Sequence, residues 1–387
     1  MSDDHRNARA IRVLLVAPSF DILGGQSVQA ARLLDRLQQE PSLRVGFLPI
    51  NPRLPGPLRL LQRVKYVRTI VTSIVYVLSL LLRVHKYDVI HVFSASYFSF
   101  VLAPTPAILI GKLYRRKVLL NYHSGEAEDH LQRWRKTAIP TIRLVDTVVV
   151  SSEYLVNVFA NFGLTAHAIH NLIEVFEFPF RQRIPLRPVF LSNRNLESHY
   201  GVDRVLRAFS IIQMSIPEAQ LDVVGDGSQR SSLESLAADL GLKNVRFRGQ
   251  VDPRLIREVY DAADIYLNGS EIDNQPLSLI EALACGIPIV TTDAGGIPYI
   301  VRHGETGMVV PRGDFEQMAT RALELLRNPQ LAKGLVTQGR QESKKYSWEA
   351  TKHSWLKTYY NLADEQLKTL SVKEDARASS PRDIATR

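Results

Sequence analysis

The sequence contains one cysteine, Cys285, among 387 residues. A single thiol excludes an intramolecular disulfide and any metal site built from several thiolates. The N-terminal stretch from Met1 to Ala10 is polar and lacks the apolar core of a signal peptide. Together these absences predict a protein of the reducing cytoplasm.

Long apolar runs are scarce as well. The segment Ile70–Leu82 is almost wholly apolar, but its thirteen residues are too few to span a bilayer, which needs about 20. Four cations precede it, at Arg59, Arg63, Lys65 and Arg68. Two interpretations remain open for this segment: an interfacial helix with a basic collar, or a buried helix of the first domain.

Acidic residues are few between Arg53 and Lys136, where fourteen Lys and Arg stand against four acids. This excess of ten accounts for the whole net charge of +9, since the remaining charges nearly cancel. A basic region indicates a nucleic acid, a phosphate-bearing substrate or an acidic membrane surface as partner, unless it is only a solvated face. No RNA- or DNA-binding motif is present, so a nucleic-acid partner is disfavoured.

The composition is that of a globular protein, with 45% hydrophobic and 22% charged residues, and the length predicts two or three domains. Short apolar runs alternate with helix-length segments, which is typical of parallel sheets covered by helices. The runs in the first half are Ile11–Ala17, Val45–Ile50, Asp88–Phe93, Lys117–Tyr122 and Thr147–Ser151. Those in the second half are Pro188–Asn193, Gln220–Val224, Asn244–Phe247, Asp264–Asn268, Ile287–Thr291 and Met308–Val310. The expected fold class is α/β, with two doubly wound Rossmann-like domains in tandem.

Domain boundaries follow from changes in this pattern. A proline-containing stretch over residues 171–187 separates the two cycles and predicts a linker. We therefore expect an N-terminal domain over residues 1–178 and a C-terminal domain over residues 179–362. Beyond Leu362 the sequence is polar and without pattern, which predicts a disordered tail over residues 363–387.

Gly24 and Gly25 follow the first strand and open a helical pattern. Flexible backbone at a helix N-terminus can bring N–H groups close to an anion, although a simple turn explains the pair equally well. The pair is not the G-x-G-x-x-G fingerprint, and no acidic residue ends the second strand to bind a ribose. The sequence thus disfavours a nicotinamide-dependent dehydrogenase.

The segment Ser270–Val310 carries the strongest functional pattern. Asp273 lies in the loop after a strand, and Pro276 can begin a helix. Glu281 falls within this helix, before Gly286 ends it. The helix N–H groups can bind a diphosphate while the two carboxylates accept hydrogen bonds from sugar and ribose hydroxyls. This combination predicts a nucleotide-sugar site.

The run PLSLIEALACGIPIVTTDAGGIP, which begins at Pro276, resembles the family 4 glycosyltransferases of the GT-B fold, and the resemblance extends to about Leu362. The family's Glu-x7-Glu motif is matched by Asp273 and Glu281, with Asp in place of the first Glu. The resemblance implies two Rossmann-like domains facing across a cleft, with the acceptor mainly in the first and the donor mainly in the second. It further implies that Asp273 acts at the donor sugar and reaction centre and that Glu281 binds the ribose.

Further site residues are implied by the same resemblance. It places Gly24 and Gly25 near the donor phosphates, His123 of the run NYHSGE near the transferred sugar, and the turn Gly225-Asp226-Gly227 after a strand of the second domain. The candidate catalytic residues are Asp273, His123 and Arg194. The candidate donor-binding residues are Gly24, Gly25, Arg194, Gly225, Gly227, Asn274, Pro276, Leu277 and Glu281.

The cations of the diphosphate site depart from the family pattern. The family has an arginine followed five or six residues later by a lysine, whereas here Arg194 is followed by His199 and Tyr200. Arg194 can make bidentate phosphate contacts, and His199 or Arg230 could supply a second charge. The missing lysine leaves a second function open, that of a catalytically degenerate nucleotide-sugar-binding protein.

The resemblance implies a retaining glycosyltransferase that moves a hexose from a UDP- or GDP-linked sugar to a hydroxyl of a glycan or lipid-linked acceptor. No cofactor and no metal site are expected, because the strand ends lack a D-x-D pattern and the leaving-group charge falls to Arg194 and backbone dipoles. The basic first domain predicts a peripheral location on the inner face of the plasma membrane, where the partner is an anionic lipid surface.

Overall fold

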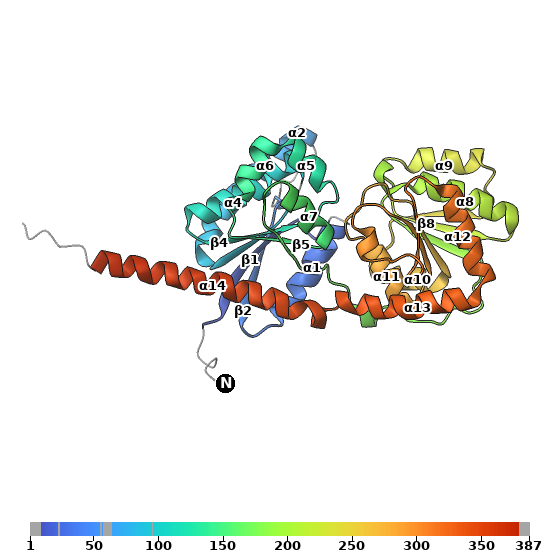
Figure 1. Ribbon diagram of the computed structural model, residues 1–387. Coiled ribbons are helices and arrows are strands. Elements are labelled where there is room, and N and C mark those ends of the chain that lie inside the picture. Colours follow the sequence, from blue (N-terminus) through green and yellow to red (C-terminus); the bar gives the residue numbers. More distant parts are fainter. Residues whose placement is uncertain (1–8, 22–23, 55, 57–63, 95, 379–387) are drawn as a thin grey trace, which may run out of the picture. The chain divides into compact units, whose positions relative to one another are not determined.

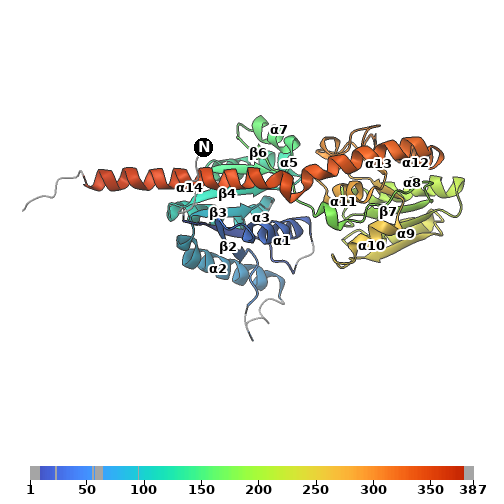
Figure 2. The same ribbon diagram turned by 90° about the horizontal axis from the view of Figure 1, so that it is seen from below.

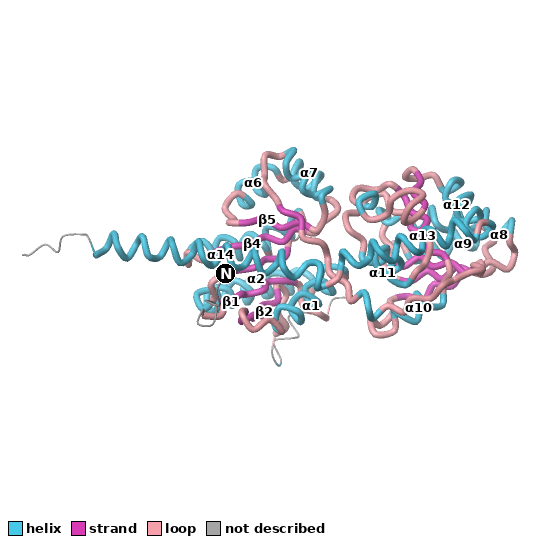
Figure 3. Tube along the Cα trace, turned by 60° about the horizontal axis from the view of Figure 1, so that its bottom comes forward, coloured by secondary structure: helices cyan, strands magenta, loops and turns pink. Residues whose placement is uncertain are grey.

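The computed structural model describes residues 9–21, 24–54, 56, 64–94 and 96–378, and the chain divides into two compact units (Figure 1). Unit 1 comprises the described residues up to Tyr122, residues 130–149 and the chain from Lys352 onward. Unit 2 comprises residues 123–129 and 150–351. The described strands form two six-stranded sheets, drawn in magenta in Figure 3, and the fold is α/β as predicted.

The first sheet has the strand order β2-β1-β3-β4-β5-β6, and β1 pairs in parallel with both β2 and β3. Its strands are β1 (Ile11–Ala17), β2 (Leu43–Pro49), β3 (Val89–Phe93), β4 (Lys117–Tyr122), β5 (Thr147–Val150) and β6 (His167–Ala168). The helices between them are α1 (Gly25–Gln38), α2 (Lys65–Arg83), α3 (Tyr97–Leu102), α4 (Pro104–Leu113), α5 (Ala127–Arg133), α6 (Arg135–Ile142) and α7 (Glu153–Asn161). The sequence pattern finds the first five strands and misses β6, because two residues are too few to show a period of two.

Burial explains why these segments adopt their structures. All five residues of β3 are buried, as expected of a parallel strand that is covered by helices on both faces. In α1 the buried side chains Ala30, Leu33, Leu34 and Leu37 recur at intervals of three and four residues. This spacing gives the helix one apolar face toward the sheet.

The second sheet has the order β12-β11-β10-β7-β8-β9, and all of its pairings are parallel. Its strands are β7 (Val189–Asn193), β8 (Gln220–Val224), β9 (Val245–Gly249), β10 (Ile265–Asn268), β11 (Ile289–Thr292) and β12 (Met308–Val310). The helices are α8 (Val202–Ser215), α9 (Arg230–Asp239), α10 (Ile256–Ala262), α11 (Leu277–Cys285), α12 (Phe315–Arg327) and α13 (Pro329–Ser343). Each predicted strand of the second half lies within two residues of an observed one.

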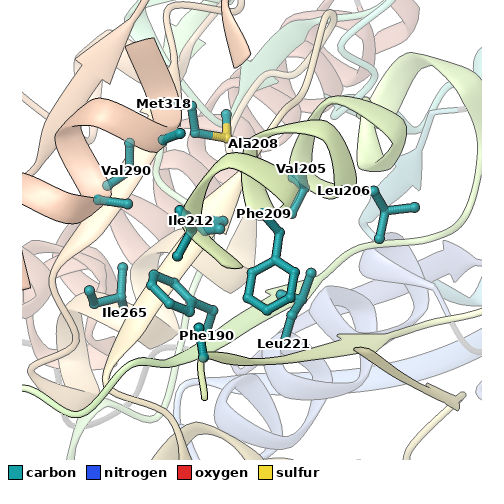
Figure 4. Close-up of a cluster of buried hydrophobic side chains, with 14 of the residues drawn as sticks. Phe190, Val205, Leu206, Ala208, Phe209, Ile212, Leu221, Ile265, Val290 and Met318 are labelled. Atoms are coloured by element: carbon teal, nitrogen blue, oxygen red, sulfur yellow. The ribbon is translucent and has the colours of Figure 1, made fainter. Parts of the chain in front are cut away.

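Successive residues of the central strands enter two different cores. Phe190 packs with α8 and α12 on one face of the sheet, whereas the next residue, Leu191, packs with α10 and α11 on the other. Figure 4 shows the first of these cores, in which Phe190 and Phe209 lie with their ring centroids 5.9 Å apart. This alternation is the consequence of the two-residue period of a strand.

The boundary between the units differs from the predicted one. Ile173, Val175 and Phe178 are buried in a core of unit 2, together with residues of α10 and α11. The backbone N–H of Ile173 also donates to the carbonyl of Tyr346, at 2.8 Å. The proline-containing stretch therefore begins inside unit 2 and packs there, where the sequence suggests an open linker.

The last helix, α14 (Trp348–Ala378), returns to unit 1 from Lys352 onward. Tyr359 Oη lies 2.7 Å from Nδ1 of the buried His91, and the ring of Trp355 stacks on the same histidine at 5.2 Å. Residues 352–362 thus belong with the first unit, and residues 363–378 are helical where the sequence predicts a disordered tail. No Gly or Pro interrupts this segment before Pro381. Residues 379–387 lie outside the described part.

Helix α2 is longer than the thirteen-residue apolar segment that lies within it. The stretch Val67–Lys86 has 20 residues and is, by length and composition alone, long and apolar enough to cross a membrane. Only 17% of its most apolar 18-residue stretch is buried. The interpretation as a buried helix of the first domain therefore holds only for the side that carries Tyr76 and Leu80. Arg59, Arg63 and the side chain of Lys65, which the sequence suggests as a basic collar, lie outside the described residues.

Candidate functional site

The segment after β10 folds as the sequence predicts. Asp273 lies in the loop between β10 and α11, and Pro276 immediately precedes the first residue of the helix. Gly286 ends the helix in a left-handed conformation, with φ of 69°. The Asp273 and Glu281 side chains are both buried, which distinguishes them from ordinary surface acids.

The main chain of the Asp273 loop is fixed by the turn at Gly295 and Gly296. A Cβ atom on Gly295 would lie 2.1 Å from the carbonyl oxygen of Asp273, and one on Gly296 would lie equally close to that of Asn274. The N–H of Gly296 donates to the Asp273 carbonyl at 3.1 Å. The two glycines are therefore required for the close approach of these two loops.

Arg194, which directly follows β7, forms an ion pair with Asp273 through Nη2. Its Nη1 lies 3.3 Å from Ser278 Oγ in the first turn of α11, and Ser270 Oγ donates to Asp273 Oδ2 at 3.2 Å. Burial lowers the pKa of Arg194, whereas the charge of Asp273 raises it, and the net shift is upward. The guanidinium is thus held as a permanent cation at the helix N-terminus.

Tyr200 occupies the position where the family has its lysine. The guanidinium carbon of Arg194 lies 4.1 Å from the centroid of the Tyr200 ring, within cation–π range. The His199 ring packs on Tyr200, and the His199 carbonyl accepts from the N–H of Glu271 at 2.9 Å. Arg230, the other candidate for a second charge, is paired with Glu234 at 2.9 Å.

Glu281 has a partner that the sequence does not reveal. Tyr260 Oη donates to Glu281 Oε2 at 3.0 Å, and Asn193 Nδ2 donates to the same phenol oxygen at 2.9 Å. Burial, reinforced by the charge of Glu281, raises the pKa of Tyr260 well above its ordinary value. Tyr260 therefore stays a neutral donor and orients the carboxylate. It comes from α10, whose spacing in the sequence gives no signal of this contact.

The turn Gly225-Asp226-Gly227 packs directly on the main chain around Arg194. Gly225 has φ of 124°, and a Cβ atom there would lie 2.1 Å from the Arg194 carbonyl oxygen. A Cβ atom on Gly227 would lie 2.5 Å from the carbonyl oxygen of Leu196. The two predicted glycines thus position the arginine loop through close backbone contact.

His123 follows β4 and belongs to unit 2, with the Asp273 loop. Burial lowers its pKa to about 4, against a smaller opposing effect of a hydrogen bond with Asn171. Asn274 Nδ2 donates to the His123 carbonyl at 3.4 Å, and a Cβ atom on Gly125 would lie 3.2 Å from the carbonyl carbon of Asp273. The structure therefore brings the His123 loop against the Asp273 loop.

The side chains of Asn274 and Gln275 are engaged within the protein. Asn274 Nδ2 donates to Ser151 Oγ at 2.7 Å, and its Oδ1 accepts from Ser152 Oγ. Gln275 Oε1 accepts from the N–H of Asn171 at 2.7 Å. These contacts tie the residues after β5 and β6 to the loop before α11. The sequence does not indicate either serine.

Of the remaining predicted positions, Pro276 and Leu277 form the start of α11. Gly24 and Gly25 lie in unit 1, where Gly25 begins α1, and nothing lies within 4 Å of a Cβ atom built on either glycine. Within the part of the chain that the structure describes, no group of three or more His, Cys, Asp or Glu side chains could hold a metal ion.

The chain is similar to several known proteins. The family described as "Glycosyl transferases group 1" matches residues 176–342, which include Arg194, Asp273 and Glu281. The GDP-mannose-dependent alpha-(1-6)-phosphatidylinositol monomannoside mannosyltransferase of Mycolicibacterium smegmatis is 28% identical over 302 residues, covering 71% of this chain and 76% of that protein. The N-acetyl-alpha-D-glucosaminyl L-malate synthase of Bacillus anthracis is 33% identical over 141 residues, or 36% of either chain.

Among solved structures, Anabaena HepE in complex with UDP and glucose superposes with a TM-score of 0.68. The superposition covers 94% of this chain and 100% of HepE, at 18% sequence identity. Sucrose-phosphate synthase from Thermosynechococcus elongatus gives a TM-score of 0.66 at 19% identity, over 96% of this chain and 100% of that one. At such low identity these likenesses concern the fold.

Proposed function

The chain is a nucleotide-sugar-dependent glycosyltransferase of family 4 with the GT-B fold, and from this premise we propose that it is a retaining, metal-independent hexosyltransferase. It moves a hexose from a UDP- or GDP-linked donor to a hydroxyl of a glycan or lipid-linked acceptor. The observation that carries this proposal is the buried ion pair of Arg194 and Asp273 at the N-terminus of α11.

The donor diphosphate binds at the start of α11. The free N–H groups and the dipole of this helix attract an anion, and Arg194, beside Ser278, adds a planar cation suited to phosphate oxygens. Glu281, oriented by Tyr260, accepts hydrogen bonds from the ribose hydroxyls. The structure of HepE, which has a similar fold, is a complex with UDP and glucose, and this supports a nucleotide-linked hexose as the donor.

Transfer proceeds on the face of the sugar from which the phosphate leaves. The bond between the anomeric carbon and the phosphate oxygen breaks, and its electron pair leaves with the nucleoside diphosphate. The acceptor oxygen forms the new bond on the same face, and its proton passes to the departing phosphate, so the configuration is retained. Asp273, held by Arg194 and Ser270, lies at the reaction centre and stabilises the positive charge that develops on the sugar.

Neither a metal ion nor an organic cofactor is part of this proposal. The negative charge on the leaving group is met by Arg194 and by the N-terminus of α11, which are fixed before the donor arrives. Fixed dipoles and cations need no reorganisation when the phosphate departs. Retention of activity in EDTA is the corresponding prediction.

The acceptor is a lipid-linked or glycan hydroxyl, and the enzyme works as a peripheral protein on the inner face of the plasma membrane. The Mycolicibacterium relative has a phosphatidylinositol glycoside in its name, whereas the Bacillus relative has malate in its name. The excess of ten positive charges between Arg53 and Lys136 favours a lipid-linked acceptor, because it suits an anionic membrane.

A second candidate function is nucleotide-sugar binding without transfer, which Tyr200 in place of the family's lysine favours. Incubation with UDP- and GDP-hexoses distinguishes the two, because an active transferase slowly hydrolyses its donor in the absence of acceptor. We expect hydrolysis of one donor by the wild type and about a hundred-fold slower hydrolysis by the Asp273→Asn variant. Binding of a donor without hydrolysis by either protein would establish the second function instead.

A further inference from the structure

Helix α2 carries an apolar stripe on its exposed side. Its members recur at intervals of three and four residues, so they share one face of the helix. They are Val67, Ile70, Ile74, Leu78 and Leu82, and between 36% and 68% of each residue's surface is exposed. Soluble proteins rarely leave such a row of large aliphatic side chains in water, so the stripe indicates a contact surface.

The stripe continues onto α4. Leu109 and Leu113 are 49% and 72% exposed, and α2 packs against α4. Tyr114 Oη donates to the carbonyl of Leu81 at 3.1 Å, which fixes the end of α4 to the last turn of α2. We call these seven aliphatic residues the α2–α4 apolar face. Figure 2 shows α2 at the periphery of unit 1, beside β2.

The opposite side of α2 is anchored in unit 1. Tyr76 and Leu80 are buried, and Tyr76 Oη donates to the carbonyl of Ala103 at 2.9 Å. The helix also connects β2 to β3, and both of these strands pair with β1 in one sheet. Crossing a bilayer would require α2 to leave this core and to separate two strands of one sheet. Its length therefore does not make it a membrane span, and a contact with a membrane would leave it parallel to the surface.

The charge around the α2–α4 apolar face is predominantly positive. Between Val64 and Arg116 the sequence has seven Lys and Arg and a single acid, Asp88. Asp88 is itself paired with Arg12 at 2.6 Å. Arg68, Lys86 and Arg115 are exposed, so this part of the surface is positive.

Two lysines of the basic region between Arg53 and Lys136 form ion pairs within the protein. Lys112 pairs with Asp146 at 2.8 Å, and Lys117 pairs with Asp146 at 3.2 Å and with Glu365 at 2.9 Å. The exposed positive charge in this region therefore lies at Arg68, Lys86 and Arg115, rather than at Lys112 and Lys117.

We propose that the α2–α4 apolar face docks on an anionic lipid bilayer, with α2 parallel to the membrane and its aliphatic side chains at the boundary between the headgroups and the acyl chains. Aliphatic side chains with cations beside them match the two layers of a bilayer surface, the acyl boundary and the negative headgroups. A second copy of this chain is a poorer occupant, because a symmetric contact would bring two positive surfaces together. The inference deepens the proposed function, on which it rests for the lipid-linked acceptor.

The first experiment measures binding of the full chain to vesicles of phosphatidylcholine, with and without phosphatidylglycerol. The wild type should bind only the anionic vesicles, and high salt should weaken this binding. The variant Ile74→Ser/Leu78→Ser should bind about ten-fold or more weakly, because two inserted side chains become polar. The matched control is Met214→Ser/Leu255→Ser, which changes two exposed apolar residues of unit 2 and should bind as the wild type does.

Two further double variants separate the electrostatic contribution to vesicle binding from the contribution of the apolar side chains. Arg68→Gln/Lys86→Gln should weaken binding to anionic vesicles, whereas Lys243→Gln/Lys333→Gln, which removes two exposed charges of unit 2, should not. Equal weakening by both pairs would mean that binding follows net charge alone and would overturn the assignment to this face.

A second experiment reports insertion directly. Cys285 is buried, and burial raises the pKa of its thiol to about 12, so an introduced cysteine can be labelled selectively. An environment-sensitive fluorophore on Leu78→Cys should shift to the blue with anionic vesicles and be quenched by quenchers carried on the lipids. The same fluorophore on Met214→Cys should show neither effect.

Three results would overturn the proposal: binding to neutral and anionic vesicles alike, a label at position 78 that stays in water, or resistance to alkaline extraction, which indicates a membrane span. If Ile74→Ser/Leu78→Ser changed the oligomeric state and left vesicle binding unchanged, the α2–α4 apolar face would be assigned to contact with a second copy of the chain. Donor hydrolysis in the absence of vesicles is measured in parallel. Its absence in the wild type would count against the proposed function while vesicle binding is still decided independently.

Discussion

The ring of Tyr200 lies 4.1 Å from the guanidinium carbon of Arg194, on a cation that is also paired with Asp273. Arg194 thus has a carboxylate on one side and an aromatic face on another. In the family pattern a lysine stands at this position and contributes charge. Here the tyrosine contributes no charge, but its ring stabilises and orients the single cation that remains.

This arrangement predicts that catalytic efficiency depends on the aromatic ring of Tyr200 and not on its hydroxyl group. Tyr200→Phe keeps the aromatic face and should leave kcat/KM within about two-fold of the wild type. Tyr200→Ala should lower it by about ten-fold, since a partly desolvated cation–π contact contributes about 1 to 2 kcal/mol. Steady-state kinetics with the donor that the wild type hydrolyses measure kcat/KM for both variants. A loss in Tyr200→Phe as large as in Tyr200→Ala would assign the role to the phenol oxygen.

Substitution of the two carboxylates of the motif, Asp273 and Glu281, should change different kinetic constants. Asp273→Asn should lower kcat by about a hundred-fold, because it weakens charge stabilisation at the reaction centre. Thermal unfolding must accompany this measurement, because the variant also leaves buried Arg194 without its ion partner.

Glu281→Gln should instead raise KM for the donor by about ten-fold and change kcat little, as expected when a uniform binding contact is weakened. Tyr260→Phe, which removes the hydroxyl that donates to Glu281, should have a smaller effect of the same kind. Equal loss of kcat in Glu281→Gln and Asp273→Asn would contradict the assignment of separate roles.

The sequence predicts most of what depends on local pattern. The strand before Asp273, the helix after Pro276 and the end of this helix at Gly286 each have a signal within a few residues, in burial pattern, proline and glycine. The partners of these residues have no such signal. Tyr260 reaches Glu281 from α10, and Ser151 reaches Asn274 from a position 123 residues earlier in the chain. Long-range contacts of this kind arise from strand order, which the spacing of residues does not encode.

The predicted boundaries between the two units differ from the observed ones for a related reason. Residues 171–187 contain prolines and charges and look like a linker, yet Ile173 and Phe178 are buried in a core built mostly from later residues. Helix α14 likewise reaches unit 1 through Trp355 and Tyr359, which pack on His91. In both cases a few buried side chains decide where a segment belongs, against its overall polarity.

The turn beside Arg194 should tolerate no side chain. Gly225→Ala would place a Cβ atom 2.1 Å from the Arg194 carbonyl and should lower the free energy of unfolding by about 2 kcal/mol or more. The control is Gly241→Ala, which also has positive φ but nothing within 4 Å of its Cβ atom, and it should cost only about 1 to 2 kcal/mol of backbone strain. Urea unfolding compares them. Equal losses would mean that the close approach to Arg194 contributes nothing.

Metal removal provides a further test. Because Arg194 and the N-terminus of α11 are assigned the leaving-group charge, donor hydrolysis should proceed at an unchanged rate after dialysis against EDTA. Addition of Mg²⁺ or Mn²⁺ to the dialysed enzyme should not raise the rate. An activity that disappears with EDTA and returns with either ion would replace the metal-independent mechanism.

Buried His123 should make stability depend on pH. Its pKa is lowered from 6.5 to about 4 by burial, so the unfolded chain binds a proton at pH values where the folded protein does not. The neutral imidazole therefore stabilises the fold fully above about pH 6.5, and this contribution falls as the pH approaches 4. This difference in pKa between the unfolded and the folded chain corresponds to a contribution of about 3 kcal/mol at most to the free energy of unfolding.

The measurement is the free energy of urea unfolding between pH 7.5 and pH 5, taken for the wild type and for His123→Gln. The difference between the two proteins should shrink toward acid, because the variant has no imidazole to protonate. His167→Gln, which removes an exposed histidine of unit 2, is the control and should run parallel to the wild type. A His123→Gln curve that also runs parallel would mean that this imidazole is protonated as readily in the folded protein as in the unfolded chain. Its burial beside Asn171 would then have no energetic consequence in this pH range.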